Sequence, residues 1–224
     1  MHGEARRCGD GGAARVGRAR RVCVVRREAW AAVAAAVGLA VVAVWWARRV
    51  LTLAQLRAVM PRLAADRAGA VLPYLDAAMR EAGIVSPRRM AAFLAQLAHE
   101  SAELRYFEEL ASGDAYEGRR DLGNTQSGDG RRYKGRGPIQ LTGRANYRDA
   151  GEALGVPLEQ RPELAATLEV GFRVAGWFWR TRELNELADA GAFDAITKRI
   201  NGGYNGKAER DAYHARATAV LGAK

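Results

Sequence analysis

Cysteine is absent from residues 51–224 of this 224-residue chain, because both of its cysteines, Cys8 and Cys23, lie near the beginning. This absence excludes disulfides and thiolate metal sites from that region, and we expect no metal site there. Stability must come from burial of apolar side chains, which a segment of this length can supply. The composition, 49% hydrophobic and 27% charged, is typical of a globular protein.

Acidic residues are scarce at the beginning of the chain, where residues 1–50 hold ten arginines and three acidic side chains. This segment carries most of the net charge of +10, so the remainder is close to charge balance. The sequence has no basic stripe with interleaved aromatic residues, and it therefore predicts no nucleic-acid partner.

Charged residues are missing from the run between Trp30 and Ala47, which arginine pairs flank on both sides. As a helix the run would be about 27 Å long at roughly 1.5 Å per residue, close to the thickness of bilayer hydrocarbon. We predict a disordered basic segment over 1–28, a transmembrane or signal-anchor helix over 29–49 and a folded domain over 50–224. Three interpretations stay open: an uncleaved anchor with the domain outside the cytoplasm, a secretory signal, or an untranslated segment and a cytoplasmic protein.

Helical periodicity dominates from residue 51 onward. It predicts helices over 53–63 with a break at Pro61, over 69–82, and from Pro87 to about Leu110 with Ser86 as N-cap. Residues 111–135 predict a long irregular loop, and 135–141 a short strand or hairpin. Further helices are expected over 144–154, 164–179, 183–190, 192–200 and 207–221. The predicted fold class is α+β, predominantly helical, with a small irregular β lobe.

One carboxylate falls on the apolar face of the helix that begins at Pro87. On a helical wheel Glu100 lies among the core positions, which are Met90, Phe93, Leu97, Leu104 and Phe107. Glu103 and Glu109 fall outside this stripe and are expected to be solvated. Because desolvation disfavours the charged form, we expect Glu100 to keep its proton near neutral pH, as a general acid must. A buried salt bridge with an arginine is the structural alternative.

Glycoside hydrolysis is one reaction that uses such an acid, and it needs a second carboxylate, which in an inverting enzyme stands roughly 6.5–9.5 Å from the first and activates a water. Glu117, in AYEGRRDLGN, would lie on a different element from Glu100 and meets this demand. Its rivals are Glu108, Asp114, Asp121 and Asp129, and composition does not choose among them.

Five motifs are spread along the chain: AFLAQLAHES (92–101), AYEGR (115–119), YKGRGPIQLTGRANY (133–147), AGWFW (175–179) and INGGYNG (200–206). Together and in this order, over about residues 51–221, they resemble glycoside hydrolase family 19, in particular its compact bacterial and phage-lysin members. The resemblance implies a lysozyme-like fold with two lobes and a cleft between them. It also implies inversion at the anomeric carbon and no metal or organic cofactor.

The resemblance further implies roles for individual residues. Glu100 would be the general acid, Glu117 the general base, and Thr142 the hydroxyl that holds the nucleophilic water. The substrate-binding set would comprise His99, Tyr133, Lys134, Arg136, Gln140, Asn146, Asn201 and Arg210, the last also tied to the catalytic carboxylates. The amide side chains could instead satisfy backbone groups or turns. We expect Trp177, Phe178 and Trp179 to belong to the core. Asn205 departs from the acidic residue of plant members.

The sequence thus predicts an inverting endo-glycosidase that acts, as a monomer, on β-1,4 bonds between N-acetylated amino sugars. Chitin and bacterial peptidoglycan both fit as the polysaccharide substrate. The alternative of a different class is a membrane-tethered, catalytically inactive wall-binding module, held through residues 30–47.

Overall fold

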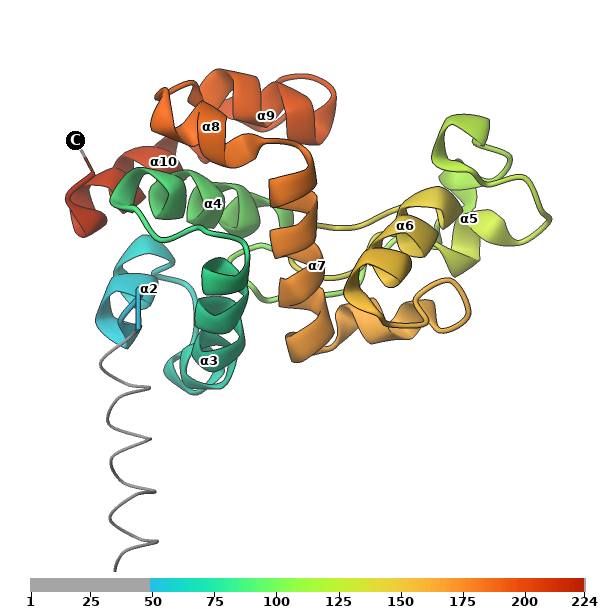
Figure 1. The fold of residues 1–224 in the computed structure, drawn as a ribbon, viewed down its shortest axis with the longest axis horizontal. Coiled ribbons are helices and arrows are strands. Elements are labelled where there is room, and N and C mark those ends of the chain that lie inside the picture. Colours follow the sequence, from blue (N-terminus) through green and yellow to red (C-terminus); the bar gives the residue numbers. More distant parts are fainter. Residues whose placement is uncertain (1–48, 224) are drawn as a thin grey trace, which may run out of the picture. The chain divides into compact units, whose positions relative to one another are not determined.

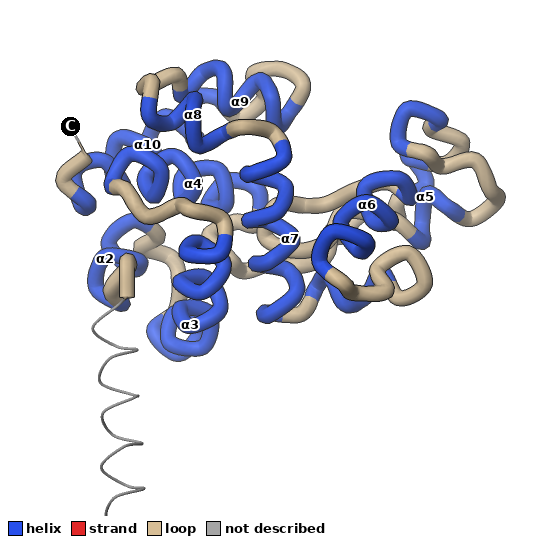
Figure 2. The backbone as a smooth tube through the Cα atoms, viewed as in Figure 1, coloured by secondary structure: helices blue, strands red, loops and turns tan. Residues whose placement is uncertain are grey.

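The structure, a computed structural model, describes residues 49–223, and a compact unit begins at Val50. Helices joined by loops make up this unit (Figure 1, Figure 2). In chain order they are α2 (Leu53–Val59), α3 (Ala65–Glu81), α4 (Pro87–Glu100), η1 (Asp114–Tyr116), η2 (Arg120–Leu122), α5 (Asp129–Arg132), α6 (Arg144–Leu154), η3 (Pro162–Ala166), α7 (Leu168–Thr181), α8 (Leu184–Asp189), α9 (Phe193–Asn201) and α10 (Lys207–Leu221). The predominantly helical fold class is confirmed.

The predicted disordered segment and membrane helix lie outside the described residues, except for Arg49. Within residues 49–223, no helix has the length and apolar content needed to cross a bilayer.

Capping signals of the sequence set many of the helix ends. Ser86 caps α4 by accepting a hydrogen bond from the backbone N–H of Arg89 at 3.3 Å, and Pro87 occupies the first helical position. Gly155 ends α6 in the left-handed conformation, with φ of 67°. For these reasons the predicted bounds of α6 and the predicted start of α4 agree with the structure.

Helix α4 ends at Glu100, well before the predicted end at Leu110. The next residues include Ala102, Glu103 and Leu104, which have φ values of 50°, 60° and 62°. This left-handed backbone is unfavourable for residues other than glycine by about 1–2 kcal/mol each. The helical wheel therefore does not apply beyond residue 100, although Leu104 and Phe107, which it assigned to the core, are buried.

Tertiary contacts hold this left-handed turn in place. The Glu103 carboxylate accepts hydrogen bonds from the backbone N–H of Arg62 at 2.6 Å, from its Nε at 2.8 Å, and from the hydroxyl of Tyr213 at 2.8 Å. Glu103 is 2% exposed, so the expectation that it is solvated was wrong. The Ser101 hydroxyl accepts from the N–H of Leu104 at 2.8 Å, and Leu104 is fully buried.

Helix α7 connects two groups of helices. It packs against α3 and α8 on one side of the molecule and against α6 and η3 on the other, and Figure 1 shows it between them. Trp179 meets Phe93 of α4 edge to face at 5.1 Å. Trp177, Phe178 and Trp179 are 8%, 9% and 0% exposed, which confirms their predicted place in the core.

In the described part of the chain, β structure is limited to two isolated bridges, Glu108–Arg136 and Arg136–Leu141. The second confirms a hairpin in GRGPIQL, and the first joins it to the segment after α4. Gly137 has φ of 74°, and a Cβ atom there would lie 2.8 Å from the carbonyl oxygen of Ala165. Only glycine allows the hairpin to pack this closely against η3.

The predicted irregular loop, residues 111–135, contains η1, η2 and α5. Asp129, 1% exposed, anchors it by accepting from the N–H groups of Thr125 at 3.0 Å and Gln126 at 2.9 Å. Its carboxylate also pairs with Arg144, the first residue of α6, at 2.5 Å. The guanidinium of Arg144 holds the pKa of Asp129 below its usual range.

We expect Asp129→Asn to lower the Tm of the full chain by several degrees at pH 7, because buried charge-assisted hydrogen bonds contribute about 1.5–3 kcal/mol. The pKa of Asp129 is lowered by folding, so its contribution is present above about pH 4 and is lost as the pH falls through the lower folded value. Thermal melts from pH 7 to pH 2 should therefore show the gap to wild type closing in acid.

The matched control is Asp121→Asn, since Asp121 pairs with Arg119 on the surface, where the two side chains are 61% and 49% exposed. This variant should melt with wild type throughout. A Tm gap for Asp129→Asn that is the same at every pH would contradict the assignment.

Candidate active site

Glu100, at the end of α4, pairs with Arg210 of α10. An Nη2–H of Arg210 donates to Oε1 of Glu100 at 2.5 Å. The side chain of Arg210 is 2% exposed and that of Glu100 is 18% exposed. Glu100 thus lies at the border of the core with a cationic partner, which is the salt-bridge alternative considered from the sequence. Its Oε2 receives no hydrogen bond from residues 49–223.

Arg210 has two further acceptors. Its Nε donates to the carbonyl oxygen of Asn205 at 3.2 Å, and its Nη1 donates to Oε1 of Gln96. The Gln96 amide donates in turn to the hydroxyl of Thr197 at 2.9 Å, and both side chains are fully buried. The network therefore extends from Glu100 into the core between α4, α9 and α10. Gln96 was not predicted from the sequence, although its place one turn before Glu100 puts both on the same helix face.

The segment between α9 and α10 rests on the end of α4. Nδ1 of His99 lies 2.8 Å from Oε2 of Glu209, and a Cβ atom at Gly206 would overlap the imidazole ring. Asn201 donates through Nδ2 to the carbonyl oxygen of Asn205 at 3.5 Å, the same oxygen that Arg210 binds. Four predicted site residues are brought together here: His99, Glu100, Asn201 and Arg210.

A second group lies at the hairpin and the start of α6. Gln140 donates through Nε2 to the carbonyl of Gly137 at 3.0 Å, and Thr142 donates through Oγ1 to the carbonyl of Gln140 at 2.9 Å. Asn146 donates through Nδ2 to the carbonyl of Thr142 at 2.7 Å. All three side chains are partly exposed.

Glu109, which was not predicted as a site residue, belongs to this second group. Its carboxylate accepts from the hydroxyl of Tyr116 at 3.0 Å and from the N–H of Gly135 at 2.9 Å. A Cβ atom on Gly135 would lie 2.7 Å from Oε1 of Gln140 and 3.1 Å from Oε2 of Glu109, so the two side chains converge there. Burial, and then the bond to Glu109, raise the pKa of Tyr116. Glu109 is thus not the free surface charge that the wheel predicted.

Glu117 directly follows η1, and its side chain reaches the beginning of α5. Its two carboxylate oxygens accept from the N–H groups of Gly128 and Gly130, each at 2.8 Å, and the residue is exposed. The rivals weighed from the sequence form ion pairs: Glu108 with Lys134 and Arg136, Asp114 with Arg131, Asp121 with Arg119, and Asp129 with Arg144.

Two predicted substrate-binding residues are buried in the small lobe, which comprises the loop of residues 111–135, the hairpin and α6. Tyr133 is 1% exposed and donates to the carbonyl of Glu159 at 2.9 Å. Arg136 is 8% exposed and donates to the carbonyl of Arg132 at 2.8 Å. Lys134 is more accessible and donates to the carbonyl of Glu109 at 3.0 Å. Of these three, Lys134 is best placed to reach a ligand.

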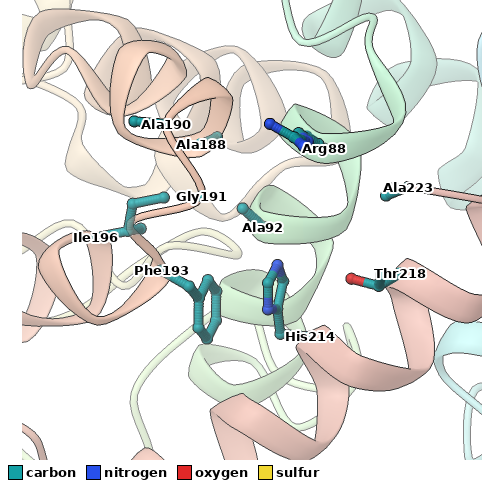
Figure 3. Close-up of a pocket in the computed structure, with 10 residues that line it drawn as sticks. All are labelled: Arg88, Ala92, Ala188, Ala190, Gly191, Phe193, Ile196, His214, Thr218 and Ala223. Atoms are coloured by element: carbon teal, nitrogen blue, oxygen red, sulfur yellow. The ribbon is translucent and has the colours of Figure 1, made fainter.

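A pocket at the opposite end of α4 is separate from these residues. Figure 3 shows Arg88 and Ala92 of α4 facing the turn between α8 and α9, with His214 and Thr218 of α10. The ring of His214 stacks on that of Phe193 at 3.9 Å, and burial lowers the pKa of His214. This pocket does not contain the carboxylates of either group.

The predominantly helical fold is that of a known class of glycoside hydrolases. The model of the chitinase class I family, glycoside hydrolase family 19, matches residues 76–212, so the chain belongs to this family. A glycosyl hydrolase family 19 domain-containing protein of Haemophilus influenzae is 32% identical over 171 residues, which cover 62% of this chain and 84% of that protein.

Other relatives match over shorter stretches or by structure. An endochitinase of Arabidopsis thaliana is 42% identical over 122 residues, and the match spans 41% of the plant protein. The crystal structure of chitinase C from Streptomyces griseus HUT6037 aligns with a TM-score of 0.63 at 28% identity, covering 78% of each chain. A class IV chitinase from Zea mays, at 24% identity and a TM-score of 0.53 over 78% of this chain and 83% of its own, shows the same fold.

We expect Arg210→Ala to lower the free energy of unfolding by about 2–4 kcal/mol, because it leaves the buried Gln96 without its donor and Glu100 without its cation. Denaturant titration of the full chain measures this. The control is Arg161→Ala, whose partner Glu163 is 61% exposed. It should change the same quantity by less than about 1 kcal/mol. Equal effects of the two substitutions would contradict a structural role of the Arg210 network.

Proposed function

We propose that this chain is an endo-acting, inverting glycosidase that hydrolyses β-1,4 bonds of N-acetylglucosamine polymers, with chitin as the first substrate to test. The names of its relatives, an endochitinase and chitinase C, support this substrate class. The observation that carries the proposal is the ion pair between Glu100 and Arg210 at the end of α4.

Glu100 is proposed as the general acid. Arg210 holds Oε1, so the proton belongs on Oε2, which lacks a partner among the described residues. When Glu100 donates this proton to the glycosidic oxygen, the carboxylate that forms is stabilised by the guanidinium already beside it. The ion pair thus favours the product of proton transfer.

Glu117 and Glu109 compete for the role of general base. Glu117 is the base that the family motif implies. Each carboxylate accepts two hydrogen bonds, Glu117 from the N–H groups of Gly128 and Gly130, and Glu109 from Tyr116 and Gly135, so these bonds do not separate them. Glu109 converges with Gln140, close along the chain to Thr142. Since the Thr142 hydroxyl donates to the Gln140 carbonyl, its oxygen is left to accept a hydrogen bond from water. A water between the two side chains would donate one hydrogen bond to Thr142 and give its other proton to the carboxylate of Glu109. These contacts favour Glu109 as the general base.

Three amides are proposed to bind the sugar, because they share one arrangement. Gln140, Asn146 and Asn201 each donate through nitrogen to a backbone carbonyl. Their amide oxygens are thereby oriented as acceptors for the N–H of an acetamido group or for sugar hydroxyls. His99 and Lys134 are proposed to contact the polymer at the edges of the two groups. Tyr133 and Arg136 would support the hairpin from inside.

Peptidoglycan is the second substrate candidate, and an inactive wall-binding module the alternative of another class. Both polymers lie outside the cytoplasm, so we propose that the chain acts there, either secreted or anchored through residues 30–47. We propose further that it acts as a monomer.

We expect Glu100→Gln to lower reducing-end release from β-1,4-linked N-acetylglucosamine oligomers roughly 10²–10⁴-fold, the usual contribution of a general acid. The full-length protein should be assayed beside bacterial sacculi, to separate chitin from peptidoglycan, with Glu152→Gln as an exposed control that retains activity. Proton NMR of fresh products should show the α-anomer first. Full activity of Glu100→Gln, or β-anomeric products, would refute this mechanism.

We expect Glu109→Gln to abolish most activity, by about 10²-fold or more, with little change in KM, because the water loses its base. Glu117→Gln should stay within a few-fold of wild type and mainly lower the Tm, because it loosens the start of α5. Kinetics and melts of both variants decide between the two carboxylates. The opposite ranking of activities would assign the base to Glu117.

A further inference from the structure

Gln96 lies in the core one turn before Glu100 and uses both ends of its amide. Its side chain is fully buried, where an amide is unfavourable unless it is hydrogen-bonded. The oxygen accepts from Nη1 of Arg210, and the nitrogen donates to the hydroxyl of Thr197 at 2.9 Å. The reversed amide would turn its N–H groups toward the guanidinium, which only donates. The orientation of Gln96 is therefore fixed by Arg210.

The acceptors around Arg210 differ in charge. Two are neutral, the amide oxygen of Gln96 and the carbonyl oxygen of Asn205, and both hold the guanidinium in place. Among residues 49–223, Glu100 is the only carboxylate that forms an ion pair with Arg210. Glu100 is therefore the one carboxylate in this group that the positive charge of Arg210 attracts at close range. A second carboxylate beside the same guanidinium would weaken this attraction.

We propose that Gln96 is a positioning residue for the reaction. Its neutral amide oxygen holds Arg210 against Oε1 of Glu100 and does not compete with Glu100 for the positive charge of Arg210. Thr197 orients this amide from α9. The inference rests on the proposed role of Glu100 as general acid. It adds that the position of the cation beside Glu100 is set by a buried amide that does not touch the substrate.

The test is Gln96→Glu, which has nearly the same shape and adds one carboxylate beside Arg210. Glu100 then shares its cation and is more easily protonated. We expect the basic limb of the kcat–pH profile to move up by about one pH unit. The kcat at the plateau should fall roughly tenfold because the ionised Glu100 is less stabilised, and KM should stay within about twofold.

The matched control is Asn185→Asp, which also replaces a buried amide by a carboxylate. Asn185 is 8% exposed, accepts from Nε1 of Trp179 at 2.9 Å and donates to the carbonyl of Ala82 at 2.9 Å. It should lower stability without moving the pH profile. A similar shift in both variants would overturn the proposal, because the effect would then be general to buried carboxylates.

A second pair of variants applies if Gln96→Glu does not fold. Thr197→Val removes the acceptor of the Gln96 amide, and we expect a three- to tenfold loss of kcat, which Thr197→Ser should restore. Equal kcat values for these two variants and wild type would overturn the proposal.

Titration of the Glu100 side-chain carboxyl by carbon-13 NMR, in the full chain without substrate, separates this inference from the proposed function. A higher titration midpoint in Gln96→Glu, or in Thr197→Val if the former does not fold, supports the positioning role. An unchanged midpoint overturns it even in an active enzyme. If the midpoint moves but wild type releases no reducing ends from chitin oligomers or sacculi, the proposed function fails and the electrostatic role of Gln96 stands.

Discussion

The buried guanidinium of Arg210 is the contact on which the arrangement around Glu100 depends. A cation in the core must have its donors satisfied, and here the acceptors come from α4 and from the segment before α10. The hydrogen bonds of the Arg210 guanidinium therefore join these elements at one point. They place Glu100 at the border of the core and, through the Asn205 carbonyl, locate Asn201 beside it. The need to satisfy one buried cation thus brings together two segments that are far apart in the sequence, 96–100 and 201–210.

A second constraint, close backbone packing, forms the other group of residues. The hairpin approaches η3 because Gly137 has no side chain, and Gln140 and Glu109 converge because Gly135 has none. The short bridges at Glu108, Arg136 and Leu141 then hold an extended segment beside the hairpin. The small lobe has little regular β structure, yet glycine contacts give it a defined shape. The acid of the proposed mechanism is fixed by buried charge, and the polar groups at the hairpin by sterics.

Much of the helical framework could be predicted, because caps and apolar spacing act locally. Ser86 with Pro87, and Gly155 after α6, gave correct boundaries. The end of α4 could not be predicted, since no glycine or proline marks it. Three left-handed residues follow Ser101, and distant partners of Glu103 hold them. Extending the wheel across this turn made Glu103 and Glu109 look solvated. A helix stopped at the HES motif would have placed Glu109 on an extended segment before the polar loop.

The sequence by itself determined the helical framework, the family and the placement of Glu100 on the inward side of α4, because these depend on local periodicity and on motif order. Tertiary structure alone decided which charges are neighbours. It paired Glu100 with Arg210, engaged Glu117 at the start of α5 and brought Glu109 next to Gln140. The physical reason is that a carboxylate's role depends on the donors around it, and those donors come from segments that only folding brings together.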